Sequence, residues 1–122
     1  MMFGKKDWFF ADGYLPEKIK SGAMDAHEAL MFFNPSKTDA VAVVTVYFSD
    51  RDPLPPIEVK VPAERVIAIR LDHKEETGGV QIPPLTQYAL GINATVPIIC
   101  QFGRVDTTQS ANAYYVGVGW AE

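Results

Sequence analysis

The chain alternates between short apolar stretches and turns rich in Pro, Gly, Asp and Asn, a spacing typical of β-sandwiches and barrels. In residues 57–61 the odd positions are aliphatic and the even ones are charged, which predicts a strand with one face in water. Residues 40–49 are rich in β-branched side chains, which favour the pleated surface of a sheet. Because this run is apolar on both faces, we expect a central strand.

Six further segments have strand character: 7–12, 26–33, 64–71, 86–93, 97–106 and 112–120. Asp12-Gly13 predicts a turn after the first of them, and Asn34-Pro35-Ser36 ends the second. Residues 72–84 form the longest irregular segment, and a loop of that length is either functional or mobile. Residues 107–111 are compatible with one helical turn. The pattern predicts a single domain over 1–122, an all-β antiparallel sandwich or jelly-roll of about eight strands.

Composition narrows the class of protein further. Hydrophobic residues make up 48% of the 122 residues, and the net charge is −4, which argues against a nucleic-acid partner. No wholly apolar run is longer than residues 40–44, which are too few to cross a bilayer. Lys5 and Lys6 lie where a signal peptide needs apolar residues, and the single Cys100 excludes an internal disulfide. We therefore expect a cytoplasmic protein.

The sequence predicts no metal site, no cofactor and no catalytic group. The two histidines, His27 and His73, fall on different elements, and there is no cysteine cluster. Cys100 lies in an apolar stretch, where a thiol is buried and inert. The glycine pairs 78–79 and 117/119 lack the lysine and following helix of a phosphate loop. The second pair predicts a twisted strand or a close backbone approach.

Polar residues inside apolar strands are the candidates for binding. Gln101 and Arg104 interrupt one strand and Arg70 ends another, while Tyr47 and Tyr115 combine a ring with a hydroxyl. Such a set suits a small polar ligand, which stacks on aromatic rings and accepts hydrogen bonds from Arg or Gln.

A structural role for the same arginines is the competing interpretation. In that case Arg70 and Arg104 pair with Asp72 or Asp106 and anchor loops.

Aromatic residues gather at both ends of the chain, at Trp8, Phe9, Phe10 and Trp120. They either pack together and join the terminal strands or form a subunit interface. We expect Trp8 to pack in the core.

Several pieces of the chain, in this order and spacing, resemble the sensory rhodopsin transducer family of small prokaryotic proteins. The resembling pieces are Ala11-Asp12-Gly13-Tyr14-Leu15-Pro16, His27-Glu28, Val46-Tyr47-Phe48-Ser49-Asp50 with Pro53, Val61-Pro62-Ala63-Glu64-Arg65, Arg70-Leu71-Asp72, Ile82-Pro83, Val96-Pro97-Ile98-Ile99-Cys100-Gln101, and Arg104-Val105-Asp106 with Gln109. The likeness runs from about Trp8 to Ala121. It departs at Glu64, where the family has a basic residue, and in the loop 74–80.

The resemblance implies a β-sandwich protomer that assembles as a homotetramer and has no enzyme activity. The family's best-known member relays a light signal from a membrane photoreceptor, and the family is also regarded as a domain that binds small molecules such as sugars. Seven positions match polar or aromatic positions of the family pattern and are the candidate ligand-binding residues: His27, Glu28, Tyr47, Arg70, Gln101, Arg104 and Asp106.

Three functions are therefore open. The leading hypothesis is a non-catalytic sensory domain that binds a small polar ligand or a partner protein. The second is a cytoplasmic transducer of a membrane photoreceptor. The third is a small metal-dependent enzyme of the jelly-roll type, which would use His27 or His73.

Overall fold

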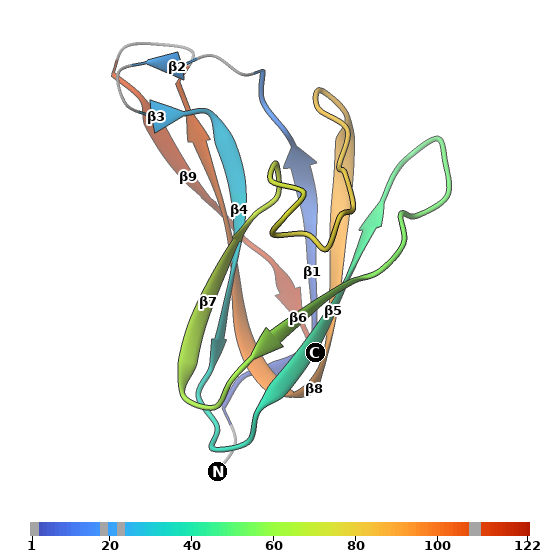
Figure 1. The fold of residues 1–122 in the computed structure, drawn as a ribbon, viewed down its shortest axis with the longest axis vertical. Coiled ribbons are helices and arrows are strands. Elements are labelled where there is room, and N and C mark those ends of the chain that lie inside the picture. The colour runs from blue at the N-terminus through green and yellow to red at the C-terminus, as the bar shows by residue number, and fades with distance from the viewer. Residues whose placement is uncertain (1–2, 18–19, 22–23, 108–110) are drawn as a thin grey trace.

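The structure, a computed structural model, describes residues 3–17, 20–21, 24–107 and 111–122. These residues form strands joined by turns, with no helix among them, as predicted (Figure 1). The strands are β1 (Lys5–Tyr14), β2 (Lys20–Ser21), β3 (Met24–Asp25), β4 (His27–Asn34), β5 (Ala40–Tyr47), β6 (Ile57–Val61), β7 (Arg65–Arg70), β8 (Gln87–Asp106), β9 (Ala113–Gly117) and β10 (Trp120–Ala121).

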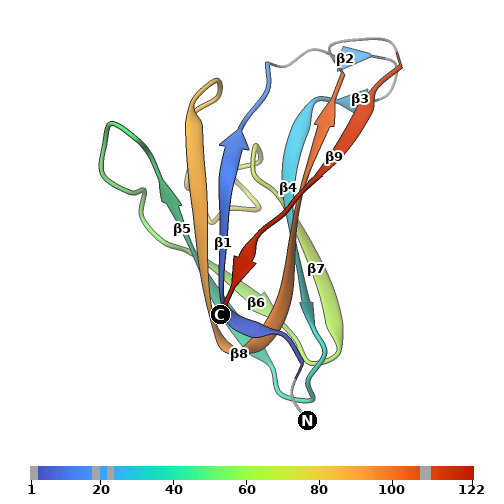
Figure 2. The same ribbon diagram turned by 180° about the vertical axis from the view of Figure 1, so that it is seen from behind.

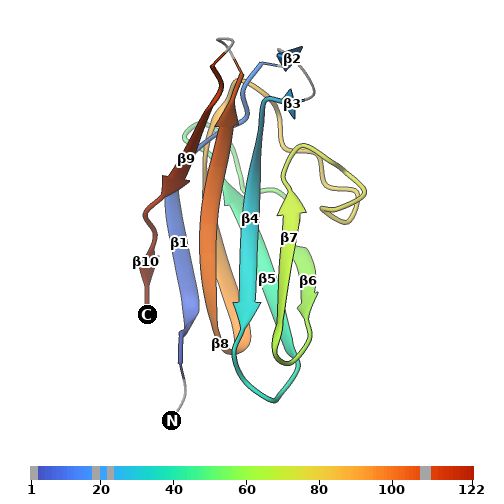
Figure 3. The same cartoon turned by 90° about the vertical axis from the view of Figure 1, so that its left-hand side faces the viewer.

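The sandwich has two antiparallel layers that share one long strand, β8. The first half of β8 lies between β1 and β5, with β10 beyond β1 and β6 beyond β5. Its second half lies between β4 and β9, with β7 beyond β4. Figure 2 shows the layers converging where β8 bends and spreading apart toward the end that carries β2, β3 and the loop 71–86, and Figure 3 shows β9, β8, β4 and β7 side by side in the second layer. We call this the open end of the sandwich.

The sequence predicts two strands, 86–93 and 97–106, where the structure has the single strand β8. The ladder with β5 runs as far as Ala94, and the ladder with β4 begins at Ile99. Pro97 lies between them, at the bend, so its missing N–H interrupts neither of these two ladders. The proline therefore marks the corner of one strand and not the gap between two.

The predicted turn at Asp12-Gly13 is also wrong. β1 continues through both residues to Tyr14, and its register against β8 shifts between Phe10 and Gly13. This irregularity has the character of a β-bulge, in which glycine is tolerated without ending the strand. At the other end of the chain, residues 112–120 form β9 and β10 with a break at 118–119. The predicted helical turn at 107–111 lies largely outside the described residues.

Strand β5 is an inner strand, as expected, but only one of its faces is in the core. Ala42, Val44 and Val46 are buried, whereas Val43 and Tyr47 are exposed on the outward face. Strand β6 shows the predicted alternation, with its aliphatic positions buried and its charged positions exposed.

The core fills the space between the layers. It is built from aliphatic and aromatic side chains of both layers, among them Phe10, Leu30, Phe32, Val44, Leu90, Ile92, Ile98 and Phe102. Cys100 belongs to it, and burial raises the pKa of its thiol to about 12, as expected for an inert cysteine. Trp8 packs against the core, and its Nε1 donates to the Ile98 carbonyl.

The two ends of the chain meet in one layer, because β1 pairs with β10. Phe9 and Trp120 lie side by side there with ring centroids 6.2 Å apart, and both are exposed. Gly117 and Gly119 are approached by the rings of Phe102 and Phe10, and not by another backbone as predicted. No helix in the described part of the chain could span a bilayer.

Gly13 provides a test of this packing. A Cβ at this position would lie 2.3 Å from Cε2 of Tyr88, a fully buried ring. We expect Gly13→Ala to lower the free energy of unfolding by about 1–3 kcal/mol, because the ring has no room to move. Urea unfolding measures this change, and a midpoint equal to that of the unsubstituted protein would contradict it.

Candidate polar binding site

A buried carboxylate stands at the open end of the sandwich. Strand β4 buries every second residue, and the first inward position of that series is Glu28, which is 0% exposed. The next inward positions are Leu30 and Phe32, which belong to the apolar core. A carboxylate so placed is costly unless it is hydrogen-bonded and paired with a cation.

Donors from two strands satisfy the Glu28 carboxylate. The Tyr88 hydroxyl donates to Oε1 at 2.5 Å, and the Tyr14 N–H donates to Oε1 and Oε2 at 3.0 and 3.2 Å. Nε of Arg104 donates to Oε2 at 2.7 Å. Tyr88 and Arg104 come from the two halves of β8, so Glu28 connects both layers. We call Glu28, Tyr88 and Arg104, with the Tyr14 N–H, the Glu28 network.

The surroundings of the Tyr88 hydroxyl and of the Arg104 guanidinium keep both groups protonated, so that both donate to Glu28. Burial, and after it the charge of Glu28, raises the pKa of Tyr88 well above its usual value, so the hydroxyl keeps its proton and donates. Desolvation alone would lower the pKa of Arg104, but hydrogen bonding to Glu28 and its charge outweigh this and raise it. Arg104 also donates through Nη2 to the Asp12 carbonyl at 3.4 Å.

A hollow of about 400 Å³ lies beside Arg104. Its lining comes from β1, from the second half of β8 and from β9: Asp12, Phe102, Arg104, Asp106, Tyr115, Val116 and Gly117. Tyr115 is paired with Arg104 in the β8–β9 register, and its ring is 52% exposed. We call this space the Arg104 hollow. A guanidinium, two carboxylates and an aromatic ring therefore surround one open space.

A second polar cluster follows β7. Arg70 donates from Nε and Nη2 to the Asp72 carboxylate at 2.9 and 2.7 Å, and hydrogen bonding to Asp72 raises the pKa of Arg70. Asp72 is nearly buried, so this pair anchors the loop, as the structural interpretation of Arg70 expects. Arg104 differs from that interpretation, because its described partner is Glu28.

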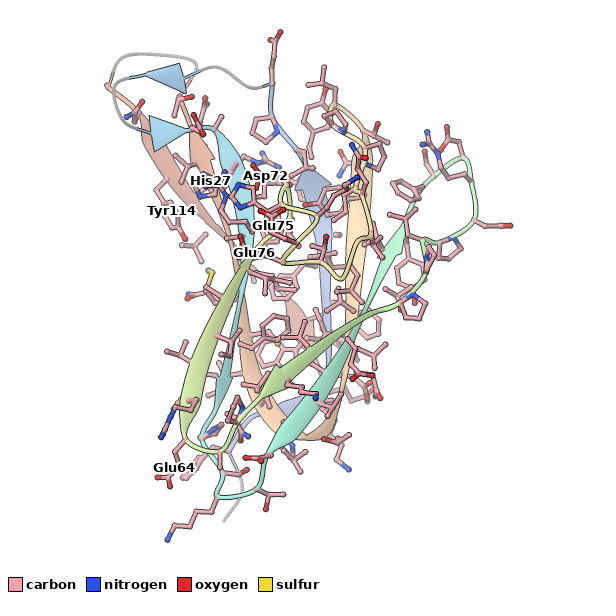
Figure 4. The ribbon with its side chains drawn as sticks, in the orientation of Figure 1. His27, Glu64, Asp72, Glu75, Glu76 and Tyr114 are labelled. Carbon is pink, nitrogen blue, oxygen red and sulfur yellow. The ribbon has the colours of Figure 1, made fainter. Side chains whose placement is uncertain are left out.

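The loop after Asp72 brings three possible metal donors together. His73 Nδ1 lies 2.7 Å from Glu76 Oε2 and 3.6 Å from Glu75 Oε1. Glu76 also accepts the backbone N–H of Arg70 at 3.1 Å. Figure 4 shows Glu75 and Glu76 near Asp72 and His27, at the end where β7 finishes, and Glu64 at the opposite end. Glu75 is exposed, and the cluster lies on the surface.

Of the seven predicted ligand-binding residues, the structure brings three together. Glu28 and Arg104 are paired, and Asp106 lines the same hollow as Arg104. Arg70 lies in the neighbouring Asp72 cluster.

The other three predicted residues lie on outward faces. His27 follows the alternation of β4 and points away from Glu28, with Nδ1 at 2.8 Å from the Asp25 carbonyl. Gln101 is exposed opposite Met31. Tyr47 lies on the outside of the other layer, next to Gly91.

Sequence reasoning missed Tyr88 and Asp12. Tyr88 occupies an ordinary apolar position of a strand, and only the pairing of β1, β4 and β8 shows that its hydroxyl meets Glu28. Asp12 was interpreted as part of a turn. The available signal was a glutamate at an inward position of an apolar strand, which demands buried donors.

Because the Glu28 network is buried, truncation of Glu28 should cause a large loss of stability. Glu28→Ala leaves Arg104 without its carboxylate partner and the Tyr88 hydroxyl without its acceptor, so we expect a loss of about 3–5 kcal/mol in the free energy of unfolding. Tyr88→Phe removes one hydroxyl and should cost about 1–3 kcal/mol. Urea unfolding measures both. Glu58→Gln, at an exposed strand position, is the control, and a Glu28→Ala effect no larger than this control would refute the role of the network.

Comparison with known proteins agrees with this architecture. The crystal structure of Thermotoga maritima 1070 superposes with a TM-score of 0.86 at 29% identity, covering 99% of this chain and 97% of that one. The Anabaena sensory rhodopsin transducer superposes with a TM-score of 0.75 at 30% identity, covering 87% of this chain and 92% of that one. No curated protein sequence matches the chain.

The family comparison covers nearly the whole sequence. The model of the Anabaena sensory rhodopsin transducer family matches residues 3–121, which confirms the resemblance drawn from the sequence. With its all-β fold and its two-layer topology, the chain belongs to the Anabaena sensory rhodopsin transducer family.

Proposed function

We propose that this protein is a non-catalytic sensory domain of the cytoplasm that binds a small polar ligand in the Arg104 hollow. The observation that carries the proposal is the placement of Arg104. Its Nε is held 2.7 Å from the fully buried Glu28, while the side chain is 26% exposed and lines an open hollow. A structural arginine alone does not need two carboxylates and an exposed ring around it, whereas polar groups that converge on one open space are typical of a ligand site.

The fold also favours this location. Ligand sites in β-barrels and sandwiches lie at the mouth, where the layers separate and loops gather. A second hollow at the same end, of about 140 Å³, is mostly apolar and includes Leu15, Leu71 and Ile82 in its lining. It is the weaker candidate for a polar ligand, because its lining offers fewer converging polar groups.

A ligand library tests the proposal. Sugars and small metabolites are screened by thermal shift, and a true ligand raises the melting temperature by several degrees, since ligand at about 100 times Kd adds about 2.7 kcal/mol of stability. Arg104→Ala should abolish the shift, and so should Tyr115→Ala, which leaves the Glu28 network intact. Gln101→Ala, on the opposite face of the same strand, is the control. A folded protein that responds to no compound would contradict the proposal.

Association with further copies of the chain is part of the proposed function. On the outward face of one layer, Val66, Phe33 and Ile99 stand side by side across β7, β4 and β8, and they are 66%, 42% and 39% exposed. Ala68 and Met31 form the next row. An apolar surface of this kind on a small domain favours burial against another protein. The family resemblance favours a homotetramer.

Light scattering after size-exclusion chromatography tests the assembly. We expect a tetramer at micromolar concentration. Val66→Lys should shift the population toward smaller species, because a charge would be buried in the interface. Val43→Lys, on the outward face of the other layer, is the matched control. A monomer for the unsubstituted protein would contradict this part of the proposal.

Transmission of a signal from a membrane photoreceptor is the second candidate function. Its support is the family itself, which is that of a sensory rhodopsin transducer. The departures at Glu64 and in the loop 74–80 argue against use of the same partner surface. A photoreceptor gene beside the gene for this chain would favour the transducer function over ligand sensing alone.

In the described part of the chain, one cluster of residues supports a metal-dependent enzyme. The possible ligand atoms of His73, Glu75 and Glu76 lie within 4.8 Å of one another. They come from one surface loop, and each has a polar neighbour already. The small apolar hollow nearby is lined by Leu71, Asp72 and Lys74 and not by these three donors. Metal analysis of protein purified without chelator distinguishes this function from the other two.

A further inference from the structure

The charges around the Arg104 hollow restrict the ligand it can take. Arg104 is the only cation among the described lining residues, and its Nε contacts the Glu28 carboxylate at 2.7 Å. At that distance in a buried setting, the guanidinium and the carboxylate largely cancel each other's field. The arginine therefore gives the hollow hydrogen-bond donors without a net positive charge.

The other ionisable groups of the lining are acidic. Asp12 and Asp106 both line the hollow, and Asp12 accepts a hydrogen bond at 3.3 Å from the neutral amide of Gln87. After the hydrogen bond to Glu28 and the charge of Glu28, which outweigh desolvation, the charge of Asp12 also acts to raise the pKa of Arg104. Among the described residues around this space, carboxylates outnumber cations three to one when Glu28 is included. An anionic ligand would be repelled, and a cationic one attracted.

The aromatic ring supplies a second element of cation recognition. Tyr115 lies opposite Arg104 across the β8–β9 pair, and its ring is half exposed along the hollow. An exposed ring near carboxylates is a favourable setting for an organic ammonium group, which is attracted to the face of the ring and to the carboxylate oxygens.

Arg104 adds a requirement for an acceptor. A guanidinium carries five N–H donors, and the described contacts of Arg104 use Nε and Nη2, the latter at a long 3.4 Å. The donors that remain on the exposed edge suit a neutral oxygen, such as a hydroxyl. The ligand therefore needs an ammonium group for Asp12 and Tyr115 and a hydroxyl within reach of Arg104.

We infer that the Arg104 hollow binds a small hydroxylated amine, an amino sugar or an amino alcohol, in preference to a neutral or anionic analogue. This inference rests on the proposed ligand-binding function and specifies the chemical class for the same site. It follows from the acidic lining, the exposed ring and the neutralised arginine together.

A matched series of sugars tests the inference. Glucosamine, glucose and glucuronate share one ring and differ in charge. In calorimetric titrations at neutral pH and low salt, we expect glucosamine to bind about tenfold more tightly than glucose, and glucuronate to bind more weakly than either. Ethanolamine, which keeps only the amine and one hydroxyl, should also bind. Added salt should weaken glucosamine binding more than glucose binding.

Variants locate the effect at the hollow. Asp12→Asn should reduce the glucosamine affinity about tenfold and leave the glucose affinity within about twofold, because it removes a charge and keeps the shape. Asp7→Asn is the matched control, since Asp7 is on the same strand but faces Asn93 on the outside of the layer. It should change neither affinity.

The outcomes separate this inference from the proposed function. Glucose or glucuronate binding as tightly as glucosamine, with a loss of binding in Tyr115→Ala, would overturn the inference and leave the ligand site standing. No binding by any member of the series would also overturn the inference, while a hit at this hollow in the wider library would keep the proposed function. An absence of binding in both the sugar series and the wider library would contradict the inference and the proposed function alike.

Discussion

The open end of this sandwich depends on one buried carboxylate. Glu28 takes an inward position of β4, surrounded by the apolar core, and a carboxylate there is tolerated only with donors on its oxygens and a cation beside it. Its donors come from β1 and from both halves of β8. The mutual placement of three strands at this end is therefore tied to a single side chain.

The bend in β8 allows residues of one strand to reach Glu28 from both layers. Because one strand passes from the first layer to the second, Tyr88 and Arg104 reach the same carboxylate from opposite sides. Two separate strands would need independent anchoring to give the same geometry. The proline at the bend lies between the ladders with β5 and β4, so the corner forms without loss of a hydrogen bond in either of them.

The sequence predicted the fold class well and the site only in part. Alternation in β6 and β-branched residues in β5 are local signals, and local signals are enough to identify strands and the solvent face. The pairing of Glu28 with Tyr88 and Arg104 depends on contacts between residues far apart in the chain, which no local pattern contains. His27, Tyr47 and Gln101 are candidates because of their residue type and the family pattern, neither of which contains the register that places them on outward faces.

In the proposed function, Arg104 combines a structural and a binding role in one side chain. Its Nε edge is committed to Glu28, and this contact removes most of the freedom that a long side chain would otherwise lose on binding a ligand. The exposed edge is thereby held in place before a ligand arrives, and a group that is already ordered costs less to use. The buried ion pair is weak evidence for stability by itself, and in the proposed site its role is to support the binding surface.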